Sequence, residues 1–211
     1  MNRNIFTILI VTLITISFAS CGDRVTINLY DVPEIPDDIT YGVVVGGVRW
    51  ATRNVGSPGV FALAPESSGS HFIWNGREDY WTEEWTNDTC PQGWRLPTEG
   101  EFISLANVPS RWINVNGVSG RLFGTAPNQI FLPAAGLREF FLNGGSNLSE
   151  INLRGVYWSN MRRISFDTNM SLMFCRNHTS VFPQHASILD WTGGFAQIRG
   201  YWAVSIRCVA E

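Results

Sequence analysis

The sequence predicts an α+β domain of short strands, one or two short helices and much irregular loop. One stretch, residues 98–106, has the start signal and the apolar spacing of a helix. Little helical periodicity follows it. Later runs are instead short, rich in β-branched and aromatic residues, and bounded by turn residues, which is typical of strands. These runs are residues 130–133, 156–159, 170–174 and 203–209.

The predicted helix begins at Thr98. Thr98 and Glu101 have the T-x-x-E spacing of a capping box, in which each side chain satisfies a backbone N–H that the first turn leaves free. An apolar stripe at i, i+3 and i+4 follows and requires a core beneath it. Its members are Phe102, Leu105 and Ala106. Pro109 ends the helix within about three turns.

Glycine pairs predict the turns between strands. Residues 43–50 read as a hairpin around Gly46-Gly47. Residues 56–76 are rich in loop-forming residues. Residues 113–124 read as short strands with turns at Asn116-Gly117 and at Ser119-Gly120.

The first 20 residues predict a lipoprotein signal peptide. Arg3 gives a positive start, residues 5–16 are almost entirely apolar, and small residues precede Cys21. We therefore expect Cys21 to be the acylated first residue of the mature chain, anchored to a membrane by its lipid. The alternative is an ordinary cleaved signal that is followed by a cysteine by chance.

Residues 21–40 are predicted to form a tether, and residues 41–211 a single domain. The tether is acidic and contains Pro33 and Pro36, so it has little to bury and we expect an extended spacer. An alternative is that residues 25–30, which alternate weakly, add an edge strand. The domain is long enough to bury a core without a metal.

Composition excludes one class of partner. The formal charge is −3 and the chain contains no lysine, so all fifteen basic residues are arginine. This balance argues against a non-specific nucleic-acid binder. A hydrophobic fraction of 45% is sufficient for a globular core.

The stretch Cys90-Pro91-Gln92-Gly93-Trp94-Arg95-Leu96-Pro97-Thr98, followed by a short helix, resembles the Fibrobacter succinogenes major paralogous domain of the C-type-lectin-like superfamily. Residues 48–56 resemble its opening strand, and residues 132–138 its central block. Residues 157–160 and 204–209 resemble its end. The resemblance implies a C-type-lectin-like fold of short antiparallel strands.

The resemblance also implies a disulfide. Cys90 and Cys208 lie in blocks where the family carries cysteines, and we expect them to pair. With Cys21 acylated, the remaining Cys175 is expected to be a buried, apolar thiol or to pair between molecules. Residues expected to be buried around the Cys90–Cys208 link are Trp94, Leu96, Leu132, Trp158 and Val209.

Neither a metal, a cofactor nor a catalytic step is expected. Cys175 and His178 have C-x-x-H spacing but lack a second ligand pair for zinc. Residues 85–88 and 126–128 both depart from the calcium-binding motifs of lectins. Residues 126–128 lack the carboxylate that calcium would need. There is no G-x-S-x-G motif. The alternative is an enzyme of the formylglycine-generating type, because such enzymes also contain the Arg-Leu-Pro-Thr-Glu motif found here at residues 95–99.

Residues 160–202 predict a ligand-binding face, because arginines and aromatic residues dominate binding hot spots. The candidates are Asn160, Arg162, Arg163, Asn169, Arg176, Asn177, His178, His185, Asp190, Trp191 and Tyr201. The alternative is that the aromatic residues of this segment belong to the core.

Taken together, these features predict an outer-membrane lipoprotein, exposed on the cell surface, that presents a C-type-lectin-like binding domain. Its expected partner is a protein or glycan on another cell or on a phage surface, and no nucleic acid. The layout is similar to that of variable proteins of diversity-generating retroelements, which implies a diversified C-terminal segment. The alternative within binding proteins is a fimbrial or envelope structural subunit.

Overall fold

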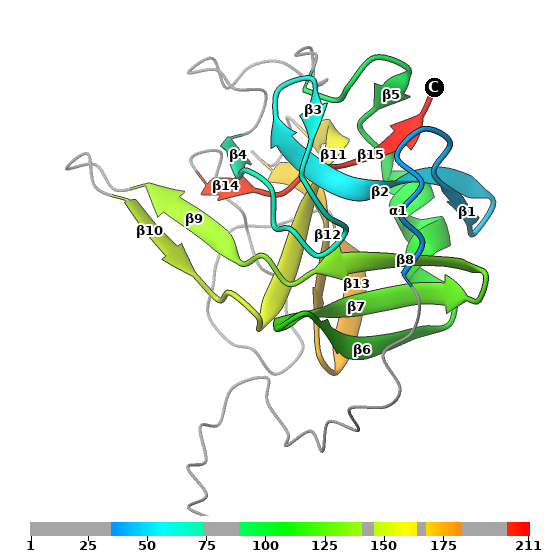
Figure 1. Ribbon diagram of the computed structural model, residues 1–211. Coiled ribbons are helices and arrows are strands. Elements are labelled where there is room, and N and C mark those ends of the chain that lie inside the picture. Colours follow the sequence, from blue (N-terminus) through cyan, green and yellow to red (C-terminus); the bar gives the residue numbers. More distant parts are fainter. Residues whose placement is uncertain (1–34, 74–88, 141–145, 164–167, 183–201) are drawn as a thin grey trace, which may run out of the picture.

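The computed structural model describes residues 35–73, 89–140, 146–163, 168–182 and 202–211 (Figure 1). These residues form mostly antiparallel β-sheets, together with one short α-helix. The prediction of an α+β domain with short antiparallel strands and one or two short helices is therefore confirmed, and the structure shows that the domain is rich in β-structure.

The first sheet joins distant parts of the chain. Its order is β1 (Val43–Val45), β2 (Val48–Ser57), β15 (Arg207–Ala210) and β5 (Trp94–Arg95), and β3 (Val60–Phe61) also pairs with β2. β1 and β2 form the predicted hairpin, with Gly46 and Gly47 at φ of 61° and 79°. Positive φ at both central residues is what a type I′ turn requires, so this prediction is confirmed.

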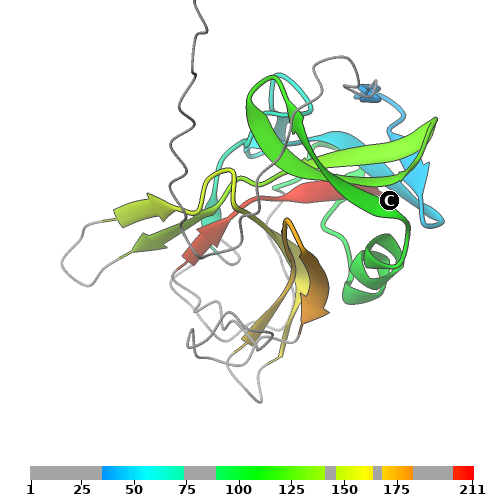
Figure 2. The same ribbon diagram turned by 90° about the horizontal axis from the view of Figure 1, so that it is seen from below.

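The second sheet has the order β10 (Ser146–Ser149), β9 (Leu137–Phe140), β14 (Trp202–Val204) and β4 (Phe72–Ile73). The strand predicted at 203–209 is therefore split between two sheets. The reason is Ser205, whose N–H donates to Val156 O and whose carbonyl accepts from Trp158 N–H. Its backbone is bonded to β11, so the strand cannot continue straight. Figure 2 shows the split segment running through the middle of the molecule, between α1 and the β9–β10 hairpin.

Two three-stranded sheets complete the β structure. One contains β6 (Ser110–Val115), β7 (Val118–Thr125) and β8 (Asn128–Pro133). The other contains β11 (Arg154–Arg163), β12 (Thr168–Cys175) and β13 (His178–Phe182).

Of the two turns predicted within residues 113–124, one is confirmed. Asn116 and Gly117 connect β6 to β7 with φ of 50° and 86°. The turn at Ser119-Gly120 is wrong, because both residues lie inside β7. Gly120 is there for a different reason: a Cβ would overlap the Leu132 carbonyl and the Phe131 ring of β8.

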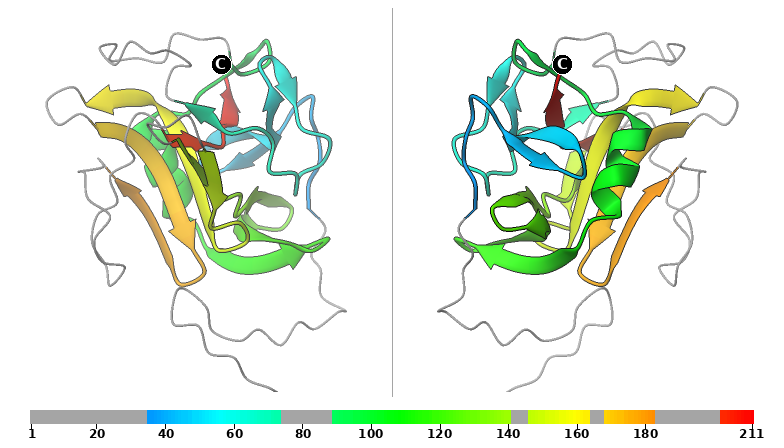
Figure 3. Two further views of the ribbon diagram at one scale, coloured as in Figure 1. Left: turned by 90° about the vertical axis from the view of Figure 1, so that its left-hand side faces the viewer. Right: turned by 90° about the vertical axis from the view of Figure 1, so that its right-hand side faces the viewer.

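The helix α1 (Glu99–Ala106) begins at the predicted cap. Thr98 Oγ1 accepts from Glu101 N–H at 3.2 Å, and the Glu101 carboxylate accepts from Thr98 N–H at 2.7 Å. Phe102 and Leu105 are buried, and Phe102 stacks on Trp50 at 5.6 Å. The helix lies beside the sheet of β11, β12 and β13 (Figure 3).

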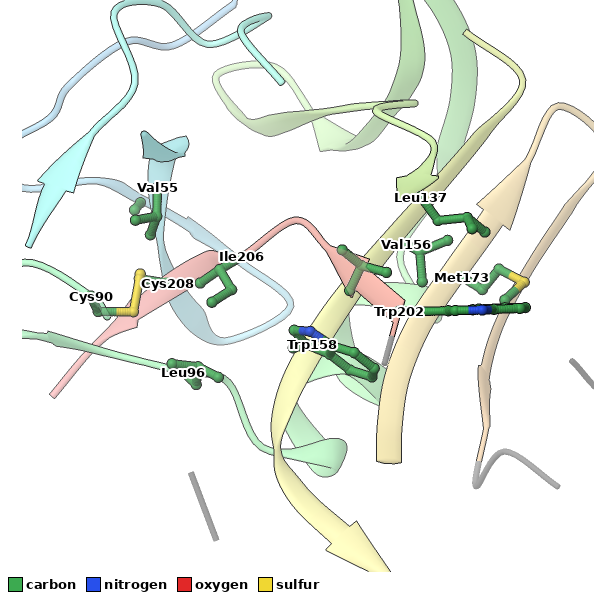
Figure 4. Close-up of a cluster of buried hydrophobic side chains, with 12 residues drawn as sticks. Val55, Cys90, Leu96, Leu137, Val156, Trp158, Met173, Trp202, Ile206 and Cys208 are labelled. Carbon is green, nitrogen blue, oxygen red and sulfur yellow. A yellow bond between two sulfur atoms is a disulfide. The ribbon is translucent and has the colours of Figure 1, made fainter. Parts of the chain in front are cut away.

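The Cys90–Cys208 disulfide is present and lies in the core, as predicted. Figure 4 shows it beside Val55 and Ile206, with Trp158 farther along the same cluster. Of the five residues expected around it, Leu96, Leu132, Trp158 and Val209 are buried. Leu132 and Val209 belong to the neighbouring cluster, which also contains Phe102.

Trp94 is only partly buried, so the prediction that it is a core residue is wrong. It lies in β5, a two-residue strand at the end of its sheet. Its indole packs against the cluster that contains the disulfide and meets the Phe61 ring in a T-shaped arrangement, with the centroids 5.7 Å apart. A strand at the end of a sheet covers its side chains on fewer sides than a central strand does.

Cys175 is buried, as expected, but it is not the free thiol that the sequence predicts. It is disulfide-bonded, and no cysteine among the described residues is free.

The end of the predicted tether packs on the domain. Ile35 contacts the cluster of Val115, Leu122 and Phe131. Asp37 forms an ion pair with Arg53 on β2, with Arg53 Nε 2.6 Å from Asp37 Oδ1. These contacts fix residues 35–40 to the β-sheets. The rest of the predicted tether, the signal peptide and the possible strand at 25–30 lie outside the described residues.

A buried arginine connects three strands. Arg207 is fully buried. Its guanidinium donates to Asn54 Oδ1, Ala51 O and Phe131 O, at 2.9, 3.1 and 3.1 Å. Burial lowers the pKa of Arg207 to about 10, so the group stays charged at neutral pH.

Tyr157, also fully buried, extends this network. Its hydroxyl donates to Pro133 O at 2.7 Å and accepts from Asn54 Nδ2 at 3.3 Å. Burial raises the pKa of Tyr157 to about 12. The network connects the first hairpin, β8, β11 and β15.

Candidate functional site

The structure places part of the predicted ligand-binding face on the β11–β12–β13 sheet. Arg162 and Arg163 lie near the end of β11, and Asn169 on β12 is directly opposite Arg162. Arg176 and Asn177 form the turn to β13, and His178 is the first residue of β13. The remaining candidates lie outside the described residues: His185, Asp190, Trp191 and Tyr201.

These candidates form two groups rather than one. In the antiparallel pair, Arg163 is opposite Thr168, whereas Arg154 at the other end of β11 is opposite Cys175. The turn at Arg176 is therefore at the far end of the ladder from Asn169. At a rise of about 3.3 Å per residue, the groups are roughly 20 Å apart. One small molecule cannot contact both.

Asn160 marks an irregularity in β11. The register shifts between Trp158 and Arg162, as at a β-bulge. Asn160 N–H donates to Pro97 O at 2.9 Å, which joins the bulge to the loop before α1. The Asn160 Oδ1 atom is buried and accepts no hydrogen bond from the described residues. In this arrangement Asn160 is half-buried against the scaffold.

Arg121 holds the turn between β12 and β13 by hydrogen bonds from its guanidinium group. Arg121 Nη2 donates to Cys175 O at 2.8 Å and to Arg176 O at 2.6 Å, and Nη1 donates to Ser110 Oγ. Burial lowers the pKa of Arg121. These hydrogen bonds fix the backbone at Cys175 and Arg176. Asn177, the next residue of the turn, is exposed to solvent.

The chain on either side of residues 183–201, which belong to the predicted binding segment, is part of a β-sheet. β13 ends at Phe182, and β14 begins at Trp202. Trp202 is buried, so it is a core residue. β14 lies between β9 and β4, which fixes the chain where it re-enters the sheet.

A polar pocket lies elsewhere on the domain. It has a volume of about 410 Å³. It is lined by Ser68, Gly69, Ser70, His71, Ala135, Arg138, Leu148 and Ile151. The sequence predicted none of these as site residues, because they come from separate segments that only the tertiary fold brings together. Arg138 carried the one available signal, since it ends the block that resembles the family.

Neither metal binding nor membrane spanning is indicated by the described residues. No three His, Cys, Asp or Glu side chains among them converge as metal ligands would. No helix in the same part of the chain has the length and apolar character to cross a membrane. Residues 85–88, which resemble a calcium-binding word, lie outside this part.

Comparisons with protein-family models, curated proteins and solved structures find no match for this chain. The fold and the bonds described above therefore define its class: a small, disulfide-linked, β-rich α+β domain.

Proposed function

We propose that the chain is a surface lipoprotein whose C-type-lectin-like domain binds a macromolecular ligand through the region of β11 to β14. The proposal rests on one observation: the C-terminal strand is fixed to the N-terminal part of the domain. β15 pairs with β2, and Cys208 bonds to Cys90. A scaffold closed in this way can tolerate variation of exposed residues within 160–202 without unfolding, because β15 lies beyond that segment and is paired with β2.

The ligand proposed is a protein or glycan on another cell or on a phage. Two candidate groups separated by roughly 20 Å suit an extended surface, since a typical protein interface buries about 800 Å² on each partner. Arginines are enriched in the energetic centres of such interfaces. The proposed mechanism is surface complementarity and involves no catalytic step.

Binding of the soluble 22–211 fragment to glycan arrays and to intact cells tests this function. Replacing Arg162 and Arg163 together by Ala should abolish most of the binding, and Asn177→Ala should weaken it. The matched control is Arg111→Ala, an exposed arginine on β6, which lies in another sheet. Equal binding by all three variants would place the interface elsewhere.

The membrane anchor is proposed to be a lipid on Cys21. Cys21→Ala should move the protein from the membrane fraction to the soluble fraction. The thioether sulfur of a lipidated cysteine cannot form a disulfide. The chain has four cysteines and Cys90 bonds to Cys208, so lipidation of Cys21 and a bond between Cys21 and Cys175 exclude each other.

The mass of the peptide that contains Cys21, measured on protein extracted from membranes, decides between these two bonds. An acylated peptide supports the anchor. A peptide linked to Cys175 contradicts it.

The proposal includes diversification of the C-terminal segment by a retroelement. Its test is genomic: a near-copy of the codons for residues 160–202, differing mainly at adenines, should lie close to the gene beside a reverse-transcriptase gene. Flanking DNA that holds neither removes diversification and leaves a fixed binding face.

A further inference from the structure

One wall of the polar pocket is a loop that the scaffold holds in place. The Ser68 carbonyl accepts from Asn54 Nδ2 at 2.9 Å and from Ser205 Oγ at 3.3 Å. Ser70 N–H donates to Val55 O at 3.0 Å. Gly69 has φ of 68° and packs so closely that a Cβ would overlap the Val55 carbonyl. The loop is therefore formed before any ligand arrives, which reduces the entropy lost on binding.

Another part of the lining, Ile151, lies in a turn with two residues of unusual backbone conformation. Glu150 and Asn152 have φ of 59° and 62°, which residues other than glycine rarely adopt. Asn152 N–H donates to Ala134 O at 2.8 Å, and Asn152 Oδ1 accepts from Ser119 N–H at 2.8 Å. Glu150 forms an ion pair with Arg154. Strain that the surrounding structure maintains is concentrated at functional sites.

This turn exposes two apolar side chains, Ile151 at 49% and Leu153 at 45%. Only Ile151 lines the pocket. Ile151, Ala135 and Leu148 supply the apolar part of the pocket lining. Apolar side chains of this kind suit the C–H face of a sugar ring.

The pocket also contains a cation. Arg138 on β9 is directly opposite Leu148 on β10, so both side chains point to the same face of the sheet. Arg138 Nη1 donates to Ser146 Oγ at 3.2 Å. No carboxylate among the described residues forms an ion pair with it. The guanidinium has five N–H donors, so several are left for a ligand.

The same pocket is lined by two residues that offer hydrogen-bond acceptors, His71 and Ser70. His71 Nε2 donates to Ala135 O at 3.0 Å, which makes Nδ1 an acceptor in the neutral ring. Burial lowers the pKa of His71, so the ring is neutral at pH 7. Ser70 Oγ donates to Gly56 O and keeps its lone pairs for hydroxyl donors.

We infer that this pocket binds an acidic sugar, a monosaccharide unit that carries a carboxylate. The carboxylate would pair with Arg138, in the two-pronged geometry that guanidinium groups favour. The sugar hydroxyls would donate to the acceptors of the loop, and the ring would pack on Leu148 and Ile151. A volume of about 410 Å³ is within the range for small-molecule sites and accommodates one sugar residue or two.

This site is separate from the face on β11 to β14, so either proposal can fail without the other. Of the two common anions, a carboxylate fits better than a phosphate. Phosphate sites gather several backbone N–H groups or cations. Here Arg138 is the only Lys or Arg side chain among the described lining residues of the pocket, which also include Leu148 and Ile151.

Isothermal titration calorimetry tests the inference. The full-length protein, purified in detergent, is titrated with D-glucuronate and, separately, with N-acetylneuraminate. At least one of the two sugars should bind. D-glucose and the methyl ester of the bound acid should bind at least about tenfold more weakly, since neither can form the charge-assisted hydrogen bonds with Arg138. Arg138→Gln should weaken binding by a similar factor, whereas Arg111→Gln should leave it unchanged.

A second matched pair keeps the test valid if Arg138→Gln fails to fold. Ile151→Ala should weaken binding several-fold, and Leu153→Ala, a similarly exposed residue of the same turn, should not. The inference is overturned if neither acidic sugar binds, if the ester binds as well as the acid, or if Ile151→Ala and Leu153→Ala behave alike.

Discussion

Removing the Cys90–Cys208 bridge should cost a large part of the stability of the domain. The perturbation is the double substitution Cys90→Ala and Cys208→Ala. The two cysteines are 118 residues apart in sequence. On the chain-entropy relation, a closed loop of that length restricts the unfolded state by about 5 kcal/mol.

This loss is comparable to the total stability of many domains, which is about 5–15 kcal/mol. For a domain of this size it corresponds to a fall in Tm of roughly 10–20 °C. The substitutions themselves are small. Cys90 and Cys208 are buried in an apolar cluster, where alanine is tolerated with little loss of volume.

The assay is urea unfolding of the 22–211 fragment, followed by tryptophan fluorescence. The single variant Cys90→Ala is the control, because it breaks the same bridge and should lose nearly the same free energy. A loss below about 1 kcal/mol in the double variant would refute the reasoning. It would mean that the bridge does not form, or that the unfolded chain is already compact.

Three further predictions concern single residues, each measured by urea unfolding. Tyr157→Phe should lower the unfolding free energy by about 1–3 kcal/mol, because it leaves a buried carbonyl and a buried amide without their hydroxyl partner; no change would show that water replaces it. Gly120→Ala should destabilise by more than about 2 kcal/mol through its clash with β8. Gly100→Ala on α1, where the nearest atom to an added Cβ is Thr98 Oγ1 at 4.0 Å, should instead stabilise by roughly 0.5–1 kcal/mol; equal effects would contradict the packing described. Burial raises the pKa of Glu101, but hydrogen bonds from Arg95 and the helix cap outweigh it, so the folded pKa lies below the ordinary 4.5. The stability that this carboxylate contributes is therefore present above pH 4.5 and is lost as the pH falls through the folded pKa, so Glu101→Gln should destabilise at pH 7 but not near about pH 2; a loss independent of pH would disprove this.

Local chemistry could be predicted from the sequence because it depends on neighbouring residues. The capping box of Thr98 and Glu101 closes within one helical turn. The turns at Gly46-Gly47 and Asn116-Gly117 need only positive φ at adjacent positions. Ser119-Gly120 has a similar composition, but there the glycine is required by contact with another strand, which a local pattern does not reveal.

Features that depend on tertiary pairing could not be predicted in this way. The break between β14 and β15 follows from hydrogen bonds of Ser205 to β11. Arginine is usually exposed, so nothing in the sequence indicated that Arg207 is fully buried. The pocket beside Arg138 requires three separate segments to meet: residues 68–71, 135–138 and 148–151. For the predicted binding face, the register of β11 and β12 decides which candidates are close together, and the sequence pattern does not contain it.

The place of β15 between β2 and β5 determines when the domain can form during protein synthesis. A nascent chain leaves the ribosome N-terminus first, at about 5–20 residues per second. Arg207 bonds to Asn54 across 153 residues, so β2 waits roughly 8–30 s for the strand that completes its sheet. During this interval the edge of β2 is open to pairing with other chains. The first sheet therefore cannot be completed until β15 has left the ribosome, and a premature stop that removes β15 leaves β2 with an open edge instead of a smaller closed domain.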